Sequence, residues 1–145
     1  MRRSAFAALS ALLLCATGAA QASDVIDDSF VRTATGIRFH DDVRGSGPEP
    51  VKGQTVEVLY TGWLMTPQHT KGKMFDHSTD PAKPFSFTLG ADQVIRGWEM
   101  GVSTMHVGGE RTLVIPPDLG YGPQGAGPIP GGATLIFDIK LLAIH

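Results

Sequence analysis

The sequence predicts an α+β fold in which an antiparallel sheet curls around one short helix. Several segments alternate apolar and polar residues with period two, which is typical of strands that have one buried face. Helical spacing occurs in one segment, around Trp98. A long Gly- and Pro-rich stretch, residues 116–132, shows no regular pattern and reads as a functional loop.

Strands are expected at four segments. Three of them alternate, and their apolar positions are Val56, Val58 and Tyr60; Phe85, Phe87 and Leu89; and Leu135, Phe137, Ile139 and Leu141. The fourth, residues 111–115, follows Gly108 and Gly109. This glycine pair suits a tight turn between strands because glycine accepts a positive φ.

One short helix is expected from about residue 95 to residue 103. Val94, Trp98 and Val102 fall at i, i+4 and i+8, so they share one helical face. Two glycines inside this segment each weaken an isolated helix by roughly 1 kcal/mol relative to alanine. The helix must therefore be stabilised by packing on the sheet.

Residues 1–22 are predicted to be a secretory signal peptide. Two arginines precede the apolar run 5–20, which ends at Ala20-Gln21-Ala22, and we expect cleavage after this motif. A membrane anchor is an alternative, but a spanning helix needs about 20 apolar residues. A lipoprotein signal at Cys15 is a second alternative, although Leu14 stands where a small residue would be expected.

The mature chain is expected to be one domain, residues 33–145, behind a loosely packed extension, residues 23–32. Export predicts a periplasmic location, with secretion as the alternative. Cys15 is the only cysteine, so the mature domain would depend on packing rather than on disulfides. The formal net charge is −2, and the sequence has no basic patch that would indicate nucleic acid or a membrane surface. We expect a monomer.

Other kinds of site find little support in the sequence. The five histidines lack the paired spacing of zinc sites, so no metal or cofactor is expected. The loop glycines are followed by Pro128-Ile129-Pro130 rather than by a helix that would bind phosphate. No Ser-His-Asp arrangement with a nucleophile elbow is present.

Taken together, these segments resemble the FKBP family of peptidyl-prolyl isomerases. The matching runs follow the family's order over almost all of residues 33–145, and they are Val58-Leu59-Tyr60-Thr61-Gly62, Phe75-Asp76, residues 83–87, residues 94–99, Tyr121-Gly122 and residues 133–138. The resemblance implies a half-barrel of antiparallel strands around a short helix. A substrate proline would enter a hollow between the helix and the sheet.

The resemblance also implies which residues form the site. Trp98 would be the floor of the pocket, and the remaining substrate-binding residues would be Tyr60, Phe75, Phe85, Val94, Ile95, Tyr121, Ile129 and Phe137. A catalytic contribution is implied for Tyr60, Asp76, Tyr121 and Phe137. Phe87, in contrast, is expected to be ordinary core.

Three features depart from the family pattern. Residues 65–74 contain several residues more than small family members have. Pro81 stands where the best-known members place an arginine that pairs with the aspartate, so Asp76 is expected to be held differently. The loop from Tyr121 to Ala133 is one residue shorter and contains no histidine.

An apolar pocket suits this chemistry because rotation about an X-Pro bond crosses a barrier of roughly 18–20 kcal/mol and needs no nucleophile. The twisted amide is less polar than the planar one, so a dry aromatic lining favours it. The backbone N–H of Ile95 and the hydroxyl of Tyr121 are candidate donors to flanking carbonyls. Asp76 either orients Tyr60 or polarises the rotating amide.

The sequence therefore predicts a prolyl isomerase that assists the folding of exported proteins. Its partners would be proline-containing, incompletely folded polypeptides and macrolide inhibitors of the FK506 and rapamycin type. A peptide-binding chaperone module with little turnover is one alternative. A secreted, host-interacting isomerase is another.

Overall fold

The computed structural model describes residues 24–145, in which seven strands form one sheet. The strands are β2 (Val31–Arg32), β3 (Arg38–Val43), β4 (Thr55–Met65), β5 (Lys71–Ser78), β6 (Phe85–Thr88), β7 (Glu110–Ile115) and β8 (Leu135–Ile144). The helical elements of this part of the chain are α2 (Arg96–Val102) and the 3₁₀ turn η2 (Pro117–Leu119). The predicted signal peptide and Cys15 lie outside the described residues.

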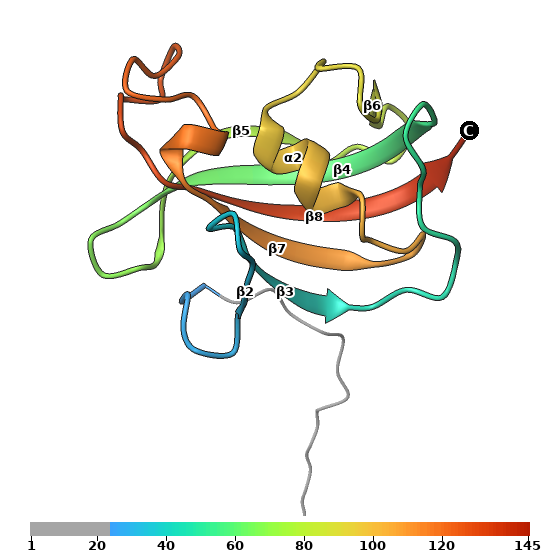
Figure 1. Ribbon diagram of the computed structural model, residues 1–145, viewed down its shortest axis with the longest axis horizontal. Helices are drawn as coiled ribbons and strands as arrows, with labels where there is room; N and C mark the ends of the chain where they lie inside the picture. The colour runs from blue at the N-terminus through green and yellow to red at the C-terminus, as the bar shows by residue number, and fades with distance from the viewer. Residues whose placement is uncertain (1–23) are drawn as a thin grey trace, which may run out of the picture.

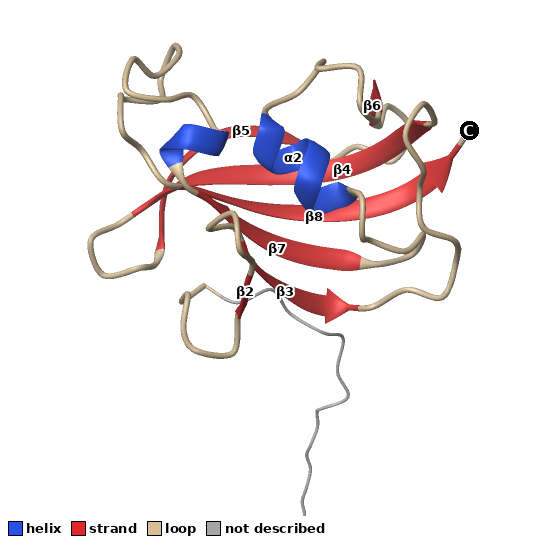
Figure 2. Ribbon diagram, in the orientation of Figure 1, coloured by secondary structure: helices blue, strands red, loops and turns tan. Residues whose placement is uncertain are grey.

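All strand pairs of the sheet are antiparallel, in the order β2-β3-β7-β8-β4-β5. β4 is the central element because it pairs with β5, β6 and β8. The sheet curves behind α2, which lies across β4 and β8 (Figures 1 and 2). The predicted α+β fold, an antiparallel sheet with one short helix, is confirmed.

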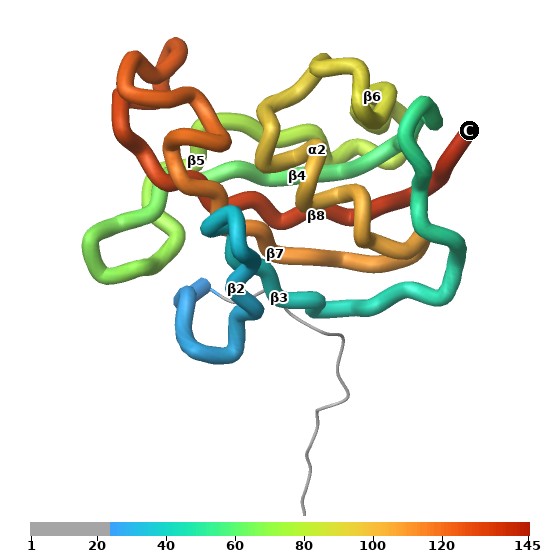
Figure 3. Tube along the Cα trace, in the orientation of Figure 1, coloured from blue at the N-terminus to red at the C-terminus, as the bar shows by residue number. Residues whose placement is uncertain are grey.

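Three excursions leave the sheet in the chain trace (Figure 3). They are the N-terminal segment, the hairpin between β4 and β5, and the loop between η2 and β8. The first two contact each other, since the backbone N–H of Ile26 donates to the carbonyl of His69 over 2.8 Å. The third excursion is the long Gly- and Pro-rich loop that the sequence marks as functional.

The main core lies between the sheet and α2, and it follows the period-two pattern of the strands. Its fully buried strand residues include Val56, Val58, Leu113, Ile115, Leu135, Ile139 and Leu141. From the helix, Trp98 and Val102 pack against them. The helix begins one residue later and ends one residue earlier than expected, with Ile95 and Ser103 as its caps.

Two glycines let α2 approach β7 more closely than any side chain would allow. A Cβ atom at Gly97 would lie 2.5 Å from Cγ2 of Ile115, and one at Gly101 would lie 2.5 Å from Cδ1 of Leu113. These distances are too short for real contacts. The glycines that weaken the isolated helix are therefore required for its packing.

Gly97→Ala is expected to lower the free energy of unfolding by about 1–3 kcal/mol because the methyl group overpacks the core. Alanine is a better helix former than glycine by about 1 kcal/mol. If α2 did not pack closely on β7, the substitution would therefore stabilise the protein. Urea unfolding distinguishes these outcomes. Arg96→Ala, at the exposed neighbouring position, is the control and should change stability by no more than about 0.5 kcal/mol.

The other face of the sheet carries a second, smaller core under the N-terminal extension. Ile26 and Phe30 are buried there and pack with Val114 of β7 and Ile136 of β8. The sequence suggested that the extension packs loosely. The structure instead shows it packed on the sheet through two buried side chains. At Val114 and Ile136 the outer face of β7 and β8 is also apolar, and the extension covers it.

The turn at Gly108 precedes β7 as expected, with a φ of 89°. It follows the helical segment, however, and does not connect two strands. The expectation of a strand before this turn was therefore wrong. The chain enters β7 from α2, which places the helix next to the strand that it packs on.

Candidate active site

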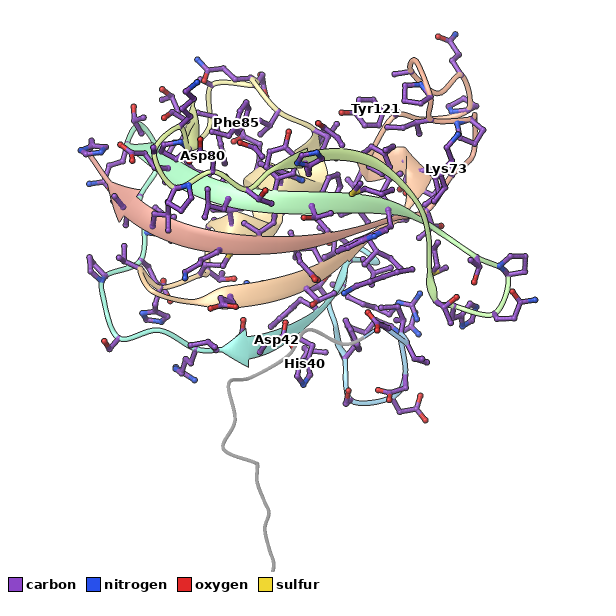
Figure 4. The ribbon with its side chains drawn as sticks, turned by 180° about the vertical axis from the view of Figure 1, so that it is seen from behind. His40, Asp42, Lys73, Asp80, Phe85 and Tyr121 are labelled. Carbon is purple, nitrogen blue, oxygen red and sulfur yellow. The ribbon has the colours of Figure 1, made fainter. Side chains whose placement is uncertain are left out.

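A cavity of about 210 Å³ opens between α2, the inner face of the sheet and the loop after η2. Its walls come from β4, β5, β6, β8 and the segment that leads into α2. The lining residues are Tyr60, Phe75, Asp76, Phe85, Gln93, Val94, Ile95, Trp98, Tyr121 and Phe137. In Figure 4, two of the labelled residues, Phe85 and Tyr121, mark the contributions of β6 and of the loop.

The cavity is an aromatic cup built around the indole of Trp98. The ring of Trp98 is 4.8 Å from that of Tyr60, 5.3 Å from that of Phe137 and 5.9 Å from that of Phe85. All three pairs meet edge to face, an arrangement that aromatic rings favour. Trp98 is only 4% exposed, yet it lines the cavity, as expected for a floor.

Asp76 and Tyr60 form the polar side of the cup. The hydroxyl of Tyr60 donates to Oδ2 of Asp76 over 2.7 Å, and the backbone N–H of His77 donates to Oδ1 over 2.8 Å. Asp76 is therefore held without the arginine that Pro81 replaces. Of the two roles considered for Asp76, the geometry supports the orientation of Tyr60.

Both tyrosines of the chain, Tyr60 and Tyr121, lie in this cavity. Burial, followed by the hydrogen bond and charge of Asp76, raises the pKa of Tyr60 above its ordinary value. Burial, followed by the charge of Asp76, raises the pKa of Tyr121 as well. Both hydroxyls are thus kept neutral and able to donate.

A spectrophotometric titration should show phenolate absorbance at a higher pH in the folded protein than in urea. Because the folded-state pKa values are raised, the stability that the two tyrosines contribute is complete below their ordinary pKa, about 10, and is lost as the pH rises through the folded values. Any activity that depends on these two hydroxyls should stay level up to about pH 10 for the same reason. Coincident folded and unfolded titrations would contradict this assignment.

One expected member of the pocket, Ile129, lies beside the cup. Ile129 is buried, 6% exposed, and lines an adjoining cavity of about 380 Å³ instead of the aromatic cup. Phe75, Asp76 and Tyr121 border both cavities, so the two are neighbours. The assignment of Ile129 to substrate binding stays a prediction, with Ile129 at the side of the cup where the two cavities meet.

Two residues of the site were not singled out from the sequence. Gln93 lines the cup as a polar side chain just before α2. Gly62 lies behind two of its walls, since a Cβ there would be 2.7 Å from Cε1 of Phe137 and 2.8 Å from Cζ of Phe75. Gly62 stands inside a matching motif, but the motif alone assigns it no role.

A model of the FKBP-type peptidyl-prolyl cis-trans isomerase family matches residues 47–142, which include every residue of the cup. The chain belongs to this family. It is a peptidyl-prolyl isomerase, as the sequence predicted. The short helix, the aromatic cup and the central strand β4 all lie within the matched range, whereas β2 and β3 precede it.

Similar proteins come from distant organisms. FK506-binding protein 4 of Dictyostelium discoideum is 49% identical over 116 residues, which are 79% of this chain and 30% of that protein. The FK506-binding protein of Neisseria meningitidis serogroup B is 46% identical and is covered over 97% of its length, with 76% of this chain aligned. The crystal structure of FkpA from Escherichia coli superposes with a TM-score of 0.72 at 38% identity, covering 81% of this chain and 52% of that one.

These coverages show that the chain spans less than a third of the Dictyostelium protein and about half of FkpA. It spans nearly all of the neisserial protein. What is shared throughout is therefore the isomerase domain. Within residues 24–145, no helix has the length and apolar character that crossing a bilayer requires.

Proposed function

We propose that this isomerase is exported, is cut after Ala22, and accelerates X-Pro rotation in proteins that fold in the periplasm or outside the cell. The export step rests on the charged, apolar and Ala-Gln-Ala segments of residues 1–22. The single observation that carries the catalytic assignment is the cup of aromatic rings around Trp98. Its edge-to-face contacts leave a hollow of about 210 Å³, which is large enough for a proline ring.

The cup would act by differential stabilisation of the twisted amide. In water, hydrogen bonds to the carbonyl favour the planar form, in which the amide is most polar. Phe85 and Phe137 offer no such hydrogen bonds to the amide that enters between them, and in the floor only the buried indole N–H of Trp98 could donate one. On entering the cup, the planar amide would lose more solvation free energy than the twisted amide. The difference lowers the barrier to rotation.

Polar groups at the rim would hold the substrate. The Tyr121 hydroxyl is a donor at the end of a rigid stem, and the backbone N–H of Ile95 lies at the N-terminal end of α2. Tyr60 is held by Asp76 and would keep its ring fixed as a wall. These residues, with Phe75 and Val94, would position the chain on both sides of the proline.

A relaxation assay on a short X-Pro peptide tests the proposal. Spontaneous isomerisation takes tens to hundreds of seconds, so a catalysed rate is easily resolved. We expect acceleration by the protein, lower acceleration by Asp76→Ala, and inhibition by a macrolide of the FK506 type. Binding of unfolded protein with a spontaneous relaxation rate would instead identify a chaperone module.

Two further measurements test location and assembly. N-terminal sequencing of the exported protein should give Ser23 as the first residue. Expression with Ala20 and Ala22 changed to bulky residues should retain the precursor. Sedimentation of the mature chain should give a monomer, and a larger species would overturn that part of the proposal.

A further inference from the structure

Gln93 is an exposed polar residue at the rim of the aromatic cup. It lies in the connection between β6 and α2, two residues before Ile95, the N-cap of the helix. Its Oε1 accepts a hydrogen bond from the backbone N–H of Thr88 over 2.8 Å. This bond fixes which end of the amide is the acceptor, and it leaves the two N–H groups of Nε2 without an acceptor among residues 24–145.

The connection that carries Gln93 is held rigidly by the helix. One carboxylate oxygen of Glu99 accepts the backbone N–H of Gly90 over 3.0 Å, and the other accepts that of Asp92 over 3.2 Å. Asp92 has a φ of 57°, in the left-handed region that aspartate tolerates better than most residues other than glycine. Gln93 is therefore placed before any ligand arrives.

The remaining polar side chains of the cup determine what Gln93 can bind. Both oxygens of Asp76 already accept hydrogen bonds, and the hydroxyl of Tyr60 donates to one of them. The side-chain donors of the cup that are left free are those of Gln93 and Tyr121 at the rim and the buried indole N–H of Trp98 in the floor. A proline offers no backbone N–H, so the chain around an X-Pro bond presents mainly carbonyl oxygens. Free donors match this substrate.

We propose that Gln93 is a substrate-binding residue whose Nε2 donates to a main-chain carbonyl flanking the proline. The inference rests on the proposed use of the aromatic cup as the proline pocket. It adds a second side-chain contact to the substrate. This contact comes from the connection between β6 and α2, whereas Tyr121 belongs to the loop between η2 and β8. Gln93 would thereby contribute to substrate affinity and to the alignment of the peptide in the cup.

Gln93→Glu is the decisive substitution because it changes only one end of the side chain. Glutamate still offers an oxygen to the Thr88 N–H, but it has no donor and would place a negative charge against a carbonyl. We expect kcat/KM on an X-Pro peptide to fall about five- to tenfold, which is the range of one hydrogen bond. The loss should lie in KM, with kcat and the melting temperature unchanged.

Gln54→Glu is the matched control. Oε1 of Gln54 also accepts a backbone N–H, that of Val51, over 2.8 Å, and Gln54 does not line the cup. The control should keep kcat/KM within about twofold of the parent, since it makes the same charge change without touching substrate. Gln93→Met removes the donor and the Thr88 contact together, so it should lose affinity and also stability.

Gln93→Glu and Gln54→Glu are compared with the parent protein by peptide relaxation and by NMR titration with the same peptide. A loss confined to KM of Gln93→Glu supports the inference. An unchanged KM, an equal loss in Gln54→Glu, or a loss in kcat alone overturns it. If the parent protein itself shows no turnover, the proposed function fails, and the peptide titration still decides whether Gln93 contacts the bound peptide.

Discussion

Phe137→Leu is expected to reduce kcat/KM by at least about tenfold, a loss of roughly 1.4 kcal/mol in transition-state stabilisation. Phe137 forms the wall of the cup nearest β5, 5.3 Å from the ring of Trp98 and 5.6 Å from the ring of Phe75. Leucine is apolar but smaller and not flat. It would let water reach the amide and remove the ring edge that packs on the floor.

Phe87→Leu is the control for this substitution. Phe87 is also on a strand, is buried to the same degree, and contacts Trp98 at 5.7 Å, but it does not line the cup. Both variants should lose about 1–3 kcal/mol of stability. Only Phe137→Leu should lose activity, in relaxation assays well below the melting temperature. An equal loss in both would mean that activity follows overall packing and not the cup.

The strands with one buried face were predictable because burial leaves a direct trace in the sequence. β4, β6, β7 and β8 each show apolar positions that the structure buries against α2. The helix was found by the spacing of Trp98 and Val102, which both face the sheet. In these elements, local pattern and tertiary environment agree.

The remaining strands depend on partners far away in the chain. β3 contains two consecutive aspartates, and one of them, Asp41, forms a two-pronged ion pair with the buried Arg111. An alternating pattern assigns such charges to the surface. β5 lies at the edge of the sheet with mostly polar residues, so its pairing with β4 leaves no apolar signature. Neither strand could be derived from local periodicity.

The residues of the site also divide into those that the sequence could assign and those that it could not. The resemblance assigned most of the cup, whereas periodicity alone would have placed Trp98 in the core. The exact position of Ile129 could not be derived from the sequence. Its loop turns through glycines with positive φ, among them Gly122 and Gly125, and no local pattern specifies the path that they produce. Gln93 was missed because a polar residue before a helix is common. Its free donors become visible only with the Thr88 bond.

Gly62→Ala is expected to have the largest effect on activity, a loss in kcat/KM of about a hundredfold, or roughly 2.7 kcal/mol. In register, Gly62 lies between Asp76 of β5 and Phe137 of β8, so its backbone is held from both sides. An added Cβ would meet the rings of Phe75 and Phe137 at 2.8 and 2.7 Å. The strand cannot retreat, and the two rings must move into the cup.

Gly101→Ala separates this effect from overpacking in general. It introduces an equally short contact, 2.5 Å to Leu113, on the side of α2 that faces β7 and away from the cup. Both variants should lose about 1–3 kcal/mol of stability in urea unfolding. Activity should fall in Gly62→Ala and stay close to that of the parent in Gly101→Ala at a temperature where both are folded. Full activity of Gly62→Ala would show that the two rings do not shape the reacting pocket, because they could then shift without consequence.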